Sequence, residues 1–363
     1  MSNSLVRTLY SDESGGTGAD LFETKQPFAV TCLILLSSEQ EHELEAVVAD
    51  LRNKNRDLLQ REMKFQKLGK TTMGLKVVRA VGQSLLSAGA RIYFGITEKR
   101  YLACHLLVET FLDVDLNPSA PLESERPGWR RWLTNKVFDA VPDQLLMDLQ
   151  SAIRSDDPEA TRRVGESLVW LLKLHPDSRV TESWRMVESG LGNVFRYGLV
   201  RPDAPPRSER PTPAVTEFAI MLRAISQDLG GRGEVARIVS DTDRQFGESL
   251  SFSLMLAKSD ERDDAHYTFA MPGPATQLLE RMEVSSESSL GVQVADIGAG
   301  IISRMAGDTC RALQLDPKLL DAWEPFLALA KMNPEYLWWR VSEKSLRMLM
   351  KPFAGTCPRL DPF

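Results

Sequence analysis

The chain has 363 residues, of which 43% are hydrophobic and 26% charged, and its formal net charge is −6. This composition is typical of a globular protein with about two domains, or with one large domain that carries an insertion. The acidic balance argues against a surface that binds nucleic acid through basic residues spread over the whole protein, and leaves room only for a local basic patch.

The cysteines have no spacing typical of a zinc site or a disulfide framework, because the four of them lie far apart, at Cys32, Cys104, Cys310 and Cys357. We therefore expect reduced thiols in a cytoplasmic protein. The N-terminal residues do not have the pattern of a signal peptide. No apolar stretch reaches the length of a membrane span, so we expect no membrane partner.

The first predicted strand covers residues 5–10, an apolar run that is followed by two carboxylates, Asp12 and Glu13. A rigid strand end holds side chains at fixed positions, as a metal site requires. Residues 12–16 also have the composition of an ordinary turn, so this stretch alone leaves both interpretations open. Residues 28–36 are continuously apolar and predict a second, buried strand that pairs antiparallel with the first.

Helices and strands are predicted to alternate over the next segment. Ser37 has the character of a helix cap, because acids follow it in the first turn, and this helix is expected to end near Leu59. Gly89 is placed to end a later helix. The further elements of this segment are a helix over 73–87, a strand over 90–97 and a helix over 100–111.

Two proline-rich stretches, 118–127 and 201–213, enclose a segment in which all strong signals are helical. We interpret this segment as a helical insertion in an α/β domain. The expected organisation is a first part of the α/β domain (1–117), the insertion (118–211), a second part of the α/β domain (212–310) and a helical C-terminal extension (311–363).

The α/β pattern resumes after the insertion, and its helix over 290–305 carries Gln293 and Asp296. Gln293 lies one turn before Asp296 on the same face and is placed to orient it. Small residues at 298–300 predict close packing of this helix on the sheet. The other elements expected here are a helix over 215–229, a strand over 234–240, a helix over 245–257 and a short strand over 282–285. Trp338 and Trp339 are expected in the core or on a partner surface, since no basic stretch accompanies them.

Two strands are thus predicted to end in acids, at Asp12 and at Asp241, and a third acid, Asp296, lies early on a helix. Carboxylates that converge repel each other and stay ionised together only where cations neutralise them. Because all the ligands are oxygen atoms, the set suits Mg²⁺ or Mn²⁺ better than zinc. Such ions support phosphodiester cleavage, which makes a nucleic acid the expected partner.

Four motifs resemble the DUF 3800 family, in chain order: Tyr10-Ser-Asp-Glu-Ser-Gly15, Glu62-Met-Lys64, Ile238-Val-Ser-Asp241 and Gln293-Val-Ala-Asp296-Ile-Gly-Ala-Gly300. The resemblance covers residues 5–111 and 215–306. This largely bacterial family is placed with the ribonuclease H-like fold, so the resemblance implies a mixed sheet flanked by helices and a metal-dependent nuclease site. It also implies the residues: Asp12, Asp241 and Asp296 as metal ligands, Glu62 assisting them, and Lys64 near the phosphate.

Several assignments stay open. Asp243 lies two residues beyond Asp241 and could replace it as the ligand, and Glu13 would point away from Asp12 if the strand pleat continues. Glu62 and Lys64 could be a solvated ion pair near a helix end. The densest basic patch near the predicted site consists of Arg61, Lys64, Lys67 and Lys70, and such a patch either contacts a phosphate backbone or is simply a solvated face.

Two functions therefore compete at this point. One is a Mg²⁺- or Mn²⁺-dependent nuclease that acts on RNA or DNA. The other is a ribonuclease H-like binding or regulatory module without catalysis, which engages a protein partner or a second copy through the helical insertion. The full set of acids favours the first, and the acidic net charge and the large insertion favour the second.

Overall fold

The computed structural model describes residues 5–15, 26–56, 59, 62–112, 117, 127–155, 157–192, 213–242, 250–251, 253–255, 257–258, 274–311, 313, 316–332, 337–350 and 359–360. These residues fall into two compact units. The first unit consists of Met1–Thr97, Ala214–Asp260 and Pro272–Leu360, and the second contains Glu98–Pro213. The helix expected over 245–257 lies mostly outside the described residues.

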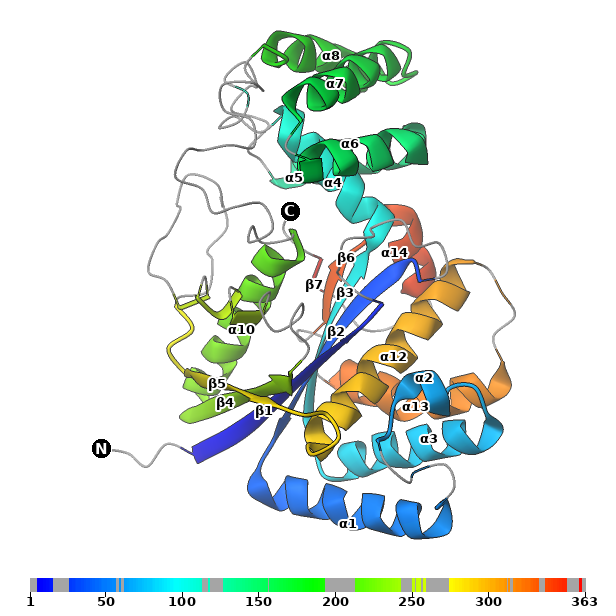
Figure 1. The fold of residues 1–363 in the computed structure, drawn as a ribbon, viewed down its shortest axis with the longest axis vertical. Coiled ribbons are helices and arrows are strands. Elements are labelled where there is room, and N and C mark those ends of the chain that lie inside the picture. Colours follow the sequence, from blue (N-terminus) through cyan, green and yellow to red (C-terminus); the bar gives the residue numbers. More distant parts are fainter. Residues whose placement is uncertain are drawn as a thin grey trace. The chain divides into compact units, whose positions relative to one another are not determined.

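Among its described residues, the first unit is built on a mixed sheet of seven strands in the order β5-β4-β1-β2-β3-β6-β7 (Figure 1). β1 runs antiparallel to β2 and parallel to β4, and β4 runs parallel to β5. The predicted α/β class and mixed sheet are therefore confirmed. The strands are β1 (Leu5–Ser14), β2 (Phe28–Leu36), β3 (Arg91–Glu98), β4 (Glu234–Asp241), β5 (Leu278–Val284), β6 (Leu337–Arg340) and β7 (Arg359–Leu360).

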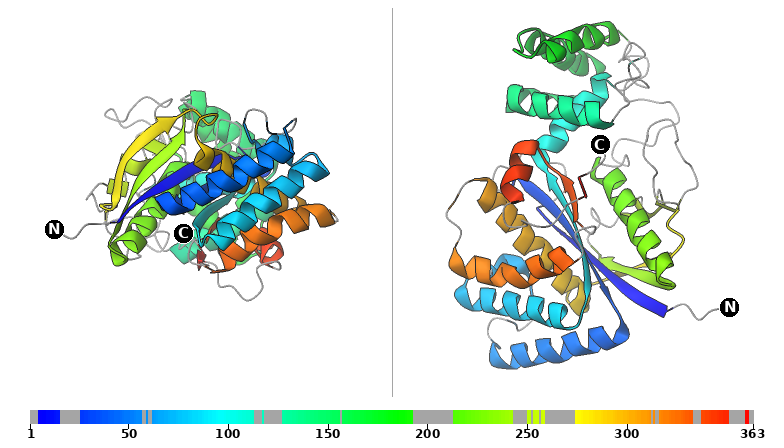
Figure 2. Two further views of the ribbon diagram at one scale, coloured as in Figure 1. Left: turned by 90° about the horizontal axis from the view of Figure 1, so that it is seen from below. Right: turned by 180° about the vertical axis from the view of Figure 1, so that it is seen from behind.

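Helices cover both faces of this sheet (Figures 1 and 2). On one face α10 packs on a core that includes Leu33 and Leu35 of β2, and on the other α1, α3, α12 and α13 pack on a core that includes Cys32 and Ile34. A strand buried on both faces has no polar side, which explains the continuous apolar run of β2. The helices are α1 (Ser38–Lys54), α2 (Phe65–Leu68), α3 (Thr72–Ser87), α10 (Pro213–Gly231), α12 (Leu290–Cys310), α13 (Pro317–Met332) and α14 (Glu343–Leu349).

The predicted cap at Ser37 is present, and it forms a reciprocal capping box with Gln40. Helix α1 ends at Lys54, earlier than expected, and its C-cap residue Asn55 donates its side-chain amide to the carbonyl oxygen of Leu51. Gly89 follows α3 with a φ of 65°, a left-handed conformation that suits glycine at this position.

The C-terminal part is not wholly helical, so the expected helical extension over 311–363 is wrong in this respect. Residues Leu337–Arg340 form β6, which pairs parallel with β3 and places Trp339 opposite Ile96. Trp339 is 2% exposed, as expected of a core residue. Aromatic side chains favour strands where they pack against a neighbouring strand, and β3 provides that neighbour. This segment therefore belongs to the α/β unit.

The second unit is helical throughout its described elements: α4 (Lys99–Leu112), α5 (Pro127–Ala140), α6 (Asp143–Ser155), α7 (Pro158–Lys173) and α8 (Ser178–Gly190). It includes α4, which we had expected to belong to the α/β domain. Asn117 explains this difference, because its buried amide donates to the carbonyl oxygens of Phe111 in α4 and Met186 in α8. Nowhere in the described chain is a helix both long and apolar enough to cross a membrane.

Candidate active site

Asp12 and Asp241 lie next to each other at one edge of the sheet. β1 continues through Ser14, so Asp12 belongs to the last residues of the strand and does not follow it. Ser11 of β1 pairs with Ser240 of β4, and the two strands run parallel. The aspartates, one residue further along each strand, therefore emerge side by side on the same face.

Helix α12 brings the third aspartate to the same place. A Cβ atom on Gly298 would lie 2.7 Å from the sulfur of Cys32, so only a glycine lets this helix approach β2 so closely. Cys32 is the register partner of Asp12. The expected close packing of the small residues on the sheet is thus confirmed at Gly298, and it brings Asp296 within electrostatic reach of Asp12.

Burial and neighbouring charges perturb the pKa values of two of the aspartates, Asp12 and Asp296. Burial, followed by the charges of Asp296 and Asp241, raises the pKa of Asp12 to about 8. Burial also raises the pKa of Asp296 to about 6, although the amide of Phe65 and the charge of Lys64 act in the opposite direction. Without a cation these acids are not all ionised at neutral pH, so the cluster has the electrostatic character of a cation site.

Each of the three carboxylates is held through one oxygen atom by backbone amides. The second oxygen of each accepts no hydrogen bond from the part of the chain that the structure describes. This arrangement fixes the orientation of each side chain and leaves an oxygen atom for a ligand. The donors are Glu13 N to Asp12 Oδ1 (2.7 Å), Phe65 N to Asp296 Oδ2 (2.6 Å), and Thr242 N and Ser286 N to Asp241 Oδ1 (2.7 and 3.2 Å).

Glu62 and Lys64 lie in the same cluster and form an ion pair of 3.2 Å. Partial burial lowers the pKa of Lys64, but the hydrogen bond and charge of Glu62 and the charges of Asp296 and Asp241 raise it, and the net shift is upward. The pair is therefore not an isolated solvated pair, since its cation faces the aspartates. The structure brings all five of the residues predicted from the sequence together.

Gln293 has a different role from the one expected. It accepts a hydrogen bond from the amide of Met63 (3.1 Å) and donates to the carbonyl oxygen of Ser286 (2.7 Å). Its buried side chain thus joins α12 to the segment that carries Glu62 and Lys64, and to the loop that contacts Asp241. The sequence contains no signal for this contact, because it depends on how two distant segments pack on the helix.

No three His, Cys, Asp or Glu side chains among the described residues are grouped closely enough to enclose one metal ion. Asp243, the alternative to Asp241, lies outside the described residues. Glu13 is paired with Thr31 in the sheet, next to Asp12, and the pleat directs it to the opposite face. The oxygen atom that each of the three aspartates keeps available is nevertheless of the kind that Mg²⁺ and Mn²⁺ bind.

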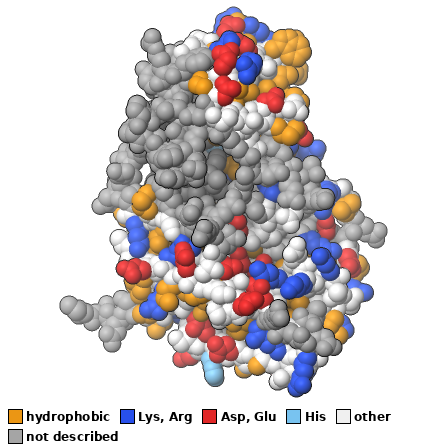
Figure 3. Space-filling model, in the orientation of Figure 1, with side chains coloured by type: hydrophobic (Ala, Val, Ile, Leu, Met, Phe, Trp, Pro, Cys, Tyr) orange, Lys and Arg blue, Asp and Glu red, His pale blue; other side chains and the backbone are white. Residues whose placement is uncertain are grey.

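Acidic and basic side chains lie next to each other on the face of the first unit that carries α2 and α12 (Figure 3).

Comparison of the chain with protein-family models, with curated proteins and with solved structures finds no significant match.

Proposed function

We propose that this protein is a Mg²⁺- or Mn²⁺-dependent phosphodiester hydrolase that acts on RNA or DNA. The observation that supports the proposal is the group of Asp12, Asp241 and Asp296, each held through one oxygen atom by a backbone amide and each with the other oxygen available. Partly buried acids that repel each other are retained at a cost in stability, which favours a functional role for them.

The topology supports the same proposal. The strands β3, β2, β1, β4 and β5 are neighbours in this order, and the sheet changes from antiparallel to parallel at β1. This arrangement agrees with the ribonuclease H-like fold that the resemblance to the DUF 3800 family implies. In such a fold β1 and β4 lie at the centre of the site, where Asp12 and Asp241 stand.

In the proposed site the three aspartates would hold divalent ions, and bound ions of this kind would supply activation of a water and stabilisation of the leaving oxygen. Lys64 lies beside Asp296 and binds a phosphate oxygen of the substrate as a point charge. Glu62 pairs with Lys64 and positions its ammonium group. The partly buried setting of Asp12 and Asp296 strengthens these electrostatic interactions, because less water screens them.

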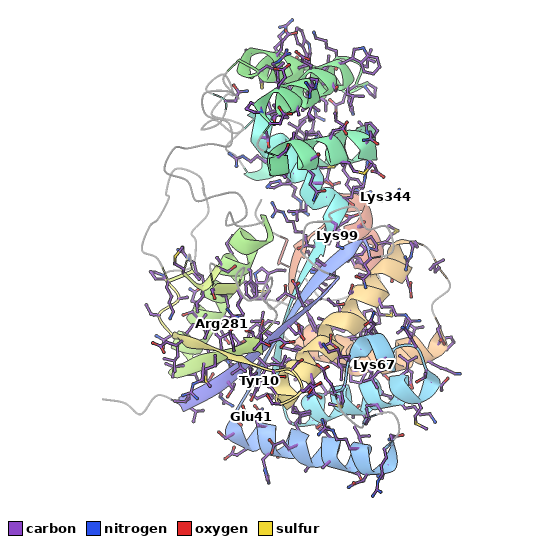
Figure 4. All side chains as sticks on the ribbon, viewed as in Figure 1. Tyr10, Glu41, Lys67, Lys99, Arg281 and Lys344 are labelled. Carbon is purple, nitrogen blue, oxygen red and sulfur yellow. The ribbon has the colours of Figure 1, made fainter. Side chains whose placement is uncertain are left out.

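Basic side chains extend from this site. Lys67 on α2, labelled in Figure 4, and Lys70 just after it are exposed, and neither forms an ion pair with another described residue. Together with Lys64 they provide three cations along one short segment. We propose that the sugar–phosphate backbone of the substrate lies along this segment.

The buried thiols of Cys32 and Cys104 are unpaired, which supports a location in the reducing cytoplasm.

The test is cleavage of labelled single- and double-stranded RNA and DNA in Mn²⁺ or in EDTA, by the wild type and by Asp296→Asn. We expect cleavage only with Mn²⁺, and loss of at least about 100-fold in the variant, the scale seen when a charge-stabilising group is removed. The matched control is Asp50→Asn, a solvent-exposed aspartate on α1. Absence of cleavage of all four substrates by folded wild type would refute the proposal.

A second candidate rests on the helical unit, which exposes large apolar side chains on α6 and at the end of α7. Met147 is 40% exposed, Trp170 62% and Leu174 63%. Exposed apolar side chains of this size favour an interface with another protein or a second copy. Sedimentation of the wild type and of Trp170→Ser tests this function. A wild type that is monomeric at all concentrations, and that cleaves nucleic acid, would exclude a role limited to self-association.

A further inference from the structure

A cavity of about 380 Å³ lies on the same sheet face as the aspartates. Its floor is formed by β1, β4 and β5, and one wall by the first turns of α1. Its volume is near the lower end of the range for small-molecule pockets, which is enough for one small ring system with its sugar. Met282, at the floor, is 44% exposed, so an apolar surface is open to a ligand.

The walls of the cavity carry opposite charges. Glu41 and Glu45, one helical turn apart on α1, line one side, and Arg237 of β4 lines another. Arg237 makes no hydrogen bond or ion pair with any described residue, whereas Tyr10 donates to Glu41 at 2.9 Å. Figure 4 shows Tyr10 on β1 next to Glu41 at the start of α1. Among the described residues, only one oxygen of Glu41 therefore accepts a hydrogen bond.

This pattern of groups selects the ligand. Carboxylates only accept hydrogen bonds and a guanidinium only donates them. A ligand that satisfies both walls must carry hydrogen-bond donors on one edge and acceptors on another. Guanine has this distribution, with N1–H and the N2 amino group as neighbouring donors and O6 and N7 as acceptors. A phosphate group does not suit the cavity, because two carboxylates face a single arginine.

The cavity is correctly placed to serve the proposed active site. Thr8 pairs with Arg237 and Tyr10 with Val239, so these side chains share the face of Asp12 and Asp241. Tyr10 precedes Asp12 by two residues, which is about 7 Å along the strand. The cavity and the aspartates are therefore about one nucleotide apart along β1.

We infer that this cavity binds an unpaired guanine base next to the scissile phosphate, and that the substrate is single-stranded or looped at this position. In a duplex the N1 and N2 donors of guanine are already used in base pairing, so a paired guanine cannot satisfy Glu41 and Glu45. The inference rests on the proposed nuclease function, and it assigns that function a substrate class and a base preference.

The experiment measures binding of guanosine, adenosine, cytidine and uridine to the full chain in EDTA by titration calorimetry. Nucleosides are used because their binding requires neither metal nor cleavage. We expect guanosine to bind at least roughly tenfold more tightly than the others, and Arg237→Met and Glu45→Gln each to weaken it about tenfold. Both side chains are exposed, so the variants should fold. The matched control is Glu43→Gln, an exposed residue of α1 that does not line the cavity.

Equal binding of all four nucleosides, or guanosine binding that neither variant weakens, would overturn the inference. The same preparations are then tested for cleavage of RNA and DNA in Mn²⁺. Metal-dependent cleavage without guanosine selectivity would overturn the guanine site and leave the nuclease. Selective guanosine binding that both variants weaken, without cleavage of any substrate, would support the base site and overturn the nuclease.

Discussion

Replacing Asp12 by Asn should stabilise the metal-free protein at neutral pH. In the folded protein burial and the neighbouring aspartates raise the pKa of Asp12 from 3.8 to about 8. The folded state therefore binds one more proton than the unfolded state between about pH 4 and pH 8. Because the unfolded state binds fewer protons there, the free energy of unfolding that depends on this group falls as the pH rises. An asparagine does not titrate and removes this dependence.

The magnitude follows from the two pKa values. In the unfolded state the carboxyl ionises with its ordinary pKa of 3.8, and pH 7 lies about 3 units above that value. Each unit corresponds to about 1.36 kcal/mol. The largest increase in the free energy of unfolding that Asp12→Asn can give at pH 7 is therefore about 4 kcal/mol. Rearrangement and entry of water reduce the cost of burying a charge, so we expect roughly 1–3 kcal/mol at pH 7. The difference should vanish near pH 4.

The assay is urea unfolding of the wild type and of Asp12→Asn in EDTA at pH 4 to 8, repeated with Mn²⁺. With Mn²⁺ at pH 7.5 the wild type should be more stable than the variant. An ion that binds only the folded state stabilises it, and the variant has lost one of the carboxylates that bind the ion. Asp50→Asn on α1 is the control, an exposed aspartate for which neither effect is expected.

One result would refute this reasoning. If Asp12 served only to accept the hydrogen bond of the Glu13 amide, then Asp12→Asn would be neutral or destabilising at every pH, with or without Mn²⁺. A stability difference that does not change between pH 4 and pH 8 would show that burial and charge repulsion do not act on Asp12 in the way the structure implies.

Three further predictions follow from the site. The affinity for Mn²⁺ should rise several-fold from pH 6 to pH 8, because the ion displaces a proton from Asp12; a titration without pH dependence would contradict this. Gly298→Val should lower the free energy of unfolding by about 1–3 kcal/mol, since its side chain would clash with Cys32, whereas Gly128→Ala, in open space, should be neutral in the same urea unfolding. Gln293→Leu should cost about 1–3 kcal/mol by leaving a buried backbone amide unpaired, and thermal unfolding that matches the wild type would exclude this role.

The sequence predicted those elements whose signal is local. β2 was expected over 28–36 and occupies Phe28–Leu36, because burial on both faces makes the whole run apolar. β6 was missed because a strand of four residues depends on its pairing with β3, far away in the chain. The assignment of α4 to the helical unit was missed for the same reason, since it depends on packing between segments distant in sequence.

The site shows the same division between local and distant signals. Asp12, Asp241 and Asp296 could be selected from the sequence because each lies at the end of a strand or early in a helix. Arg237 could not be selected, because on β4 it is one exposed residue in an alternating pattern. Its significance depends on Glu41, about 200 residues earlier, which reaches the same cavity only after α1 has folded onto the sheet.

Packing and electrostatics are coupled at one point in this fold. Gly298 lets α12 approach Cys32, and Cys32 is the register partner of Asp12, so the same close contact determines how near Asp296 lies to Asp12. A larger residue at 298 would move the helix away and reduce the repulsion between the two acids. The pKa of Asp12 should then fall toward its ordinary value, and the protein should bind Mn²⁺ more weakly even though every carboxylate is retained. The proposed nuclease site would therefore depend on a glycine that contacts no ligand.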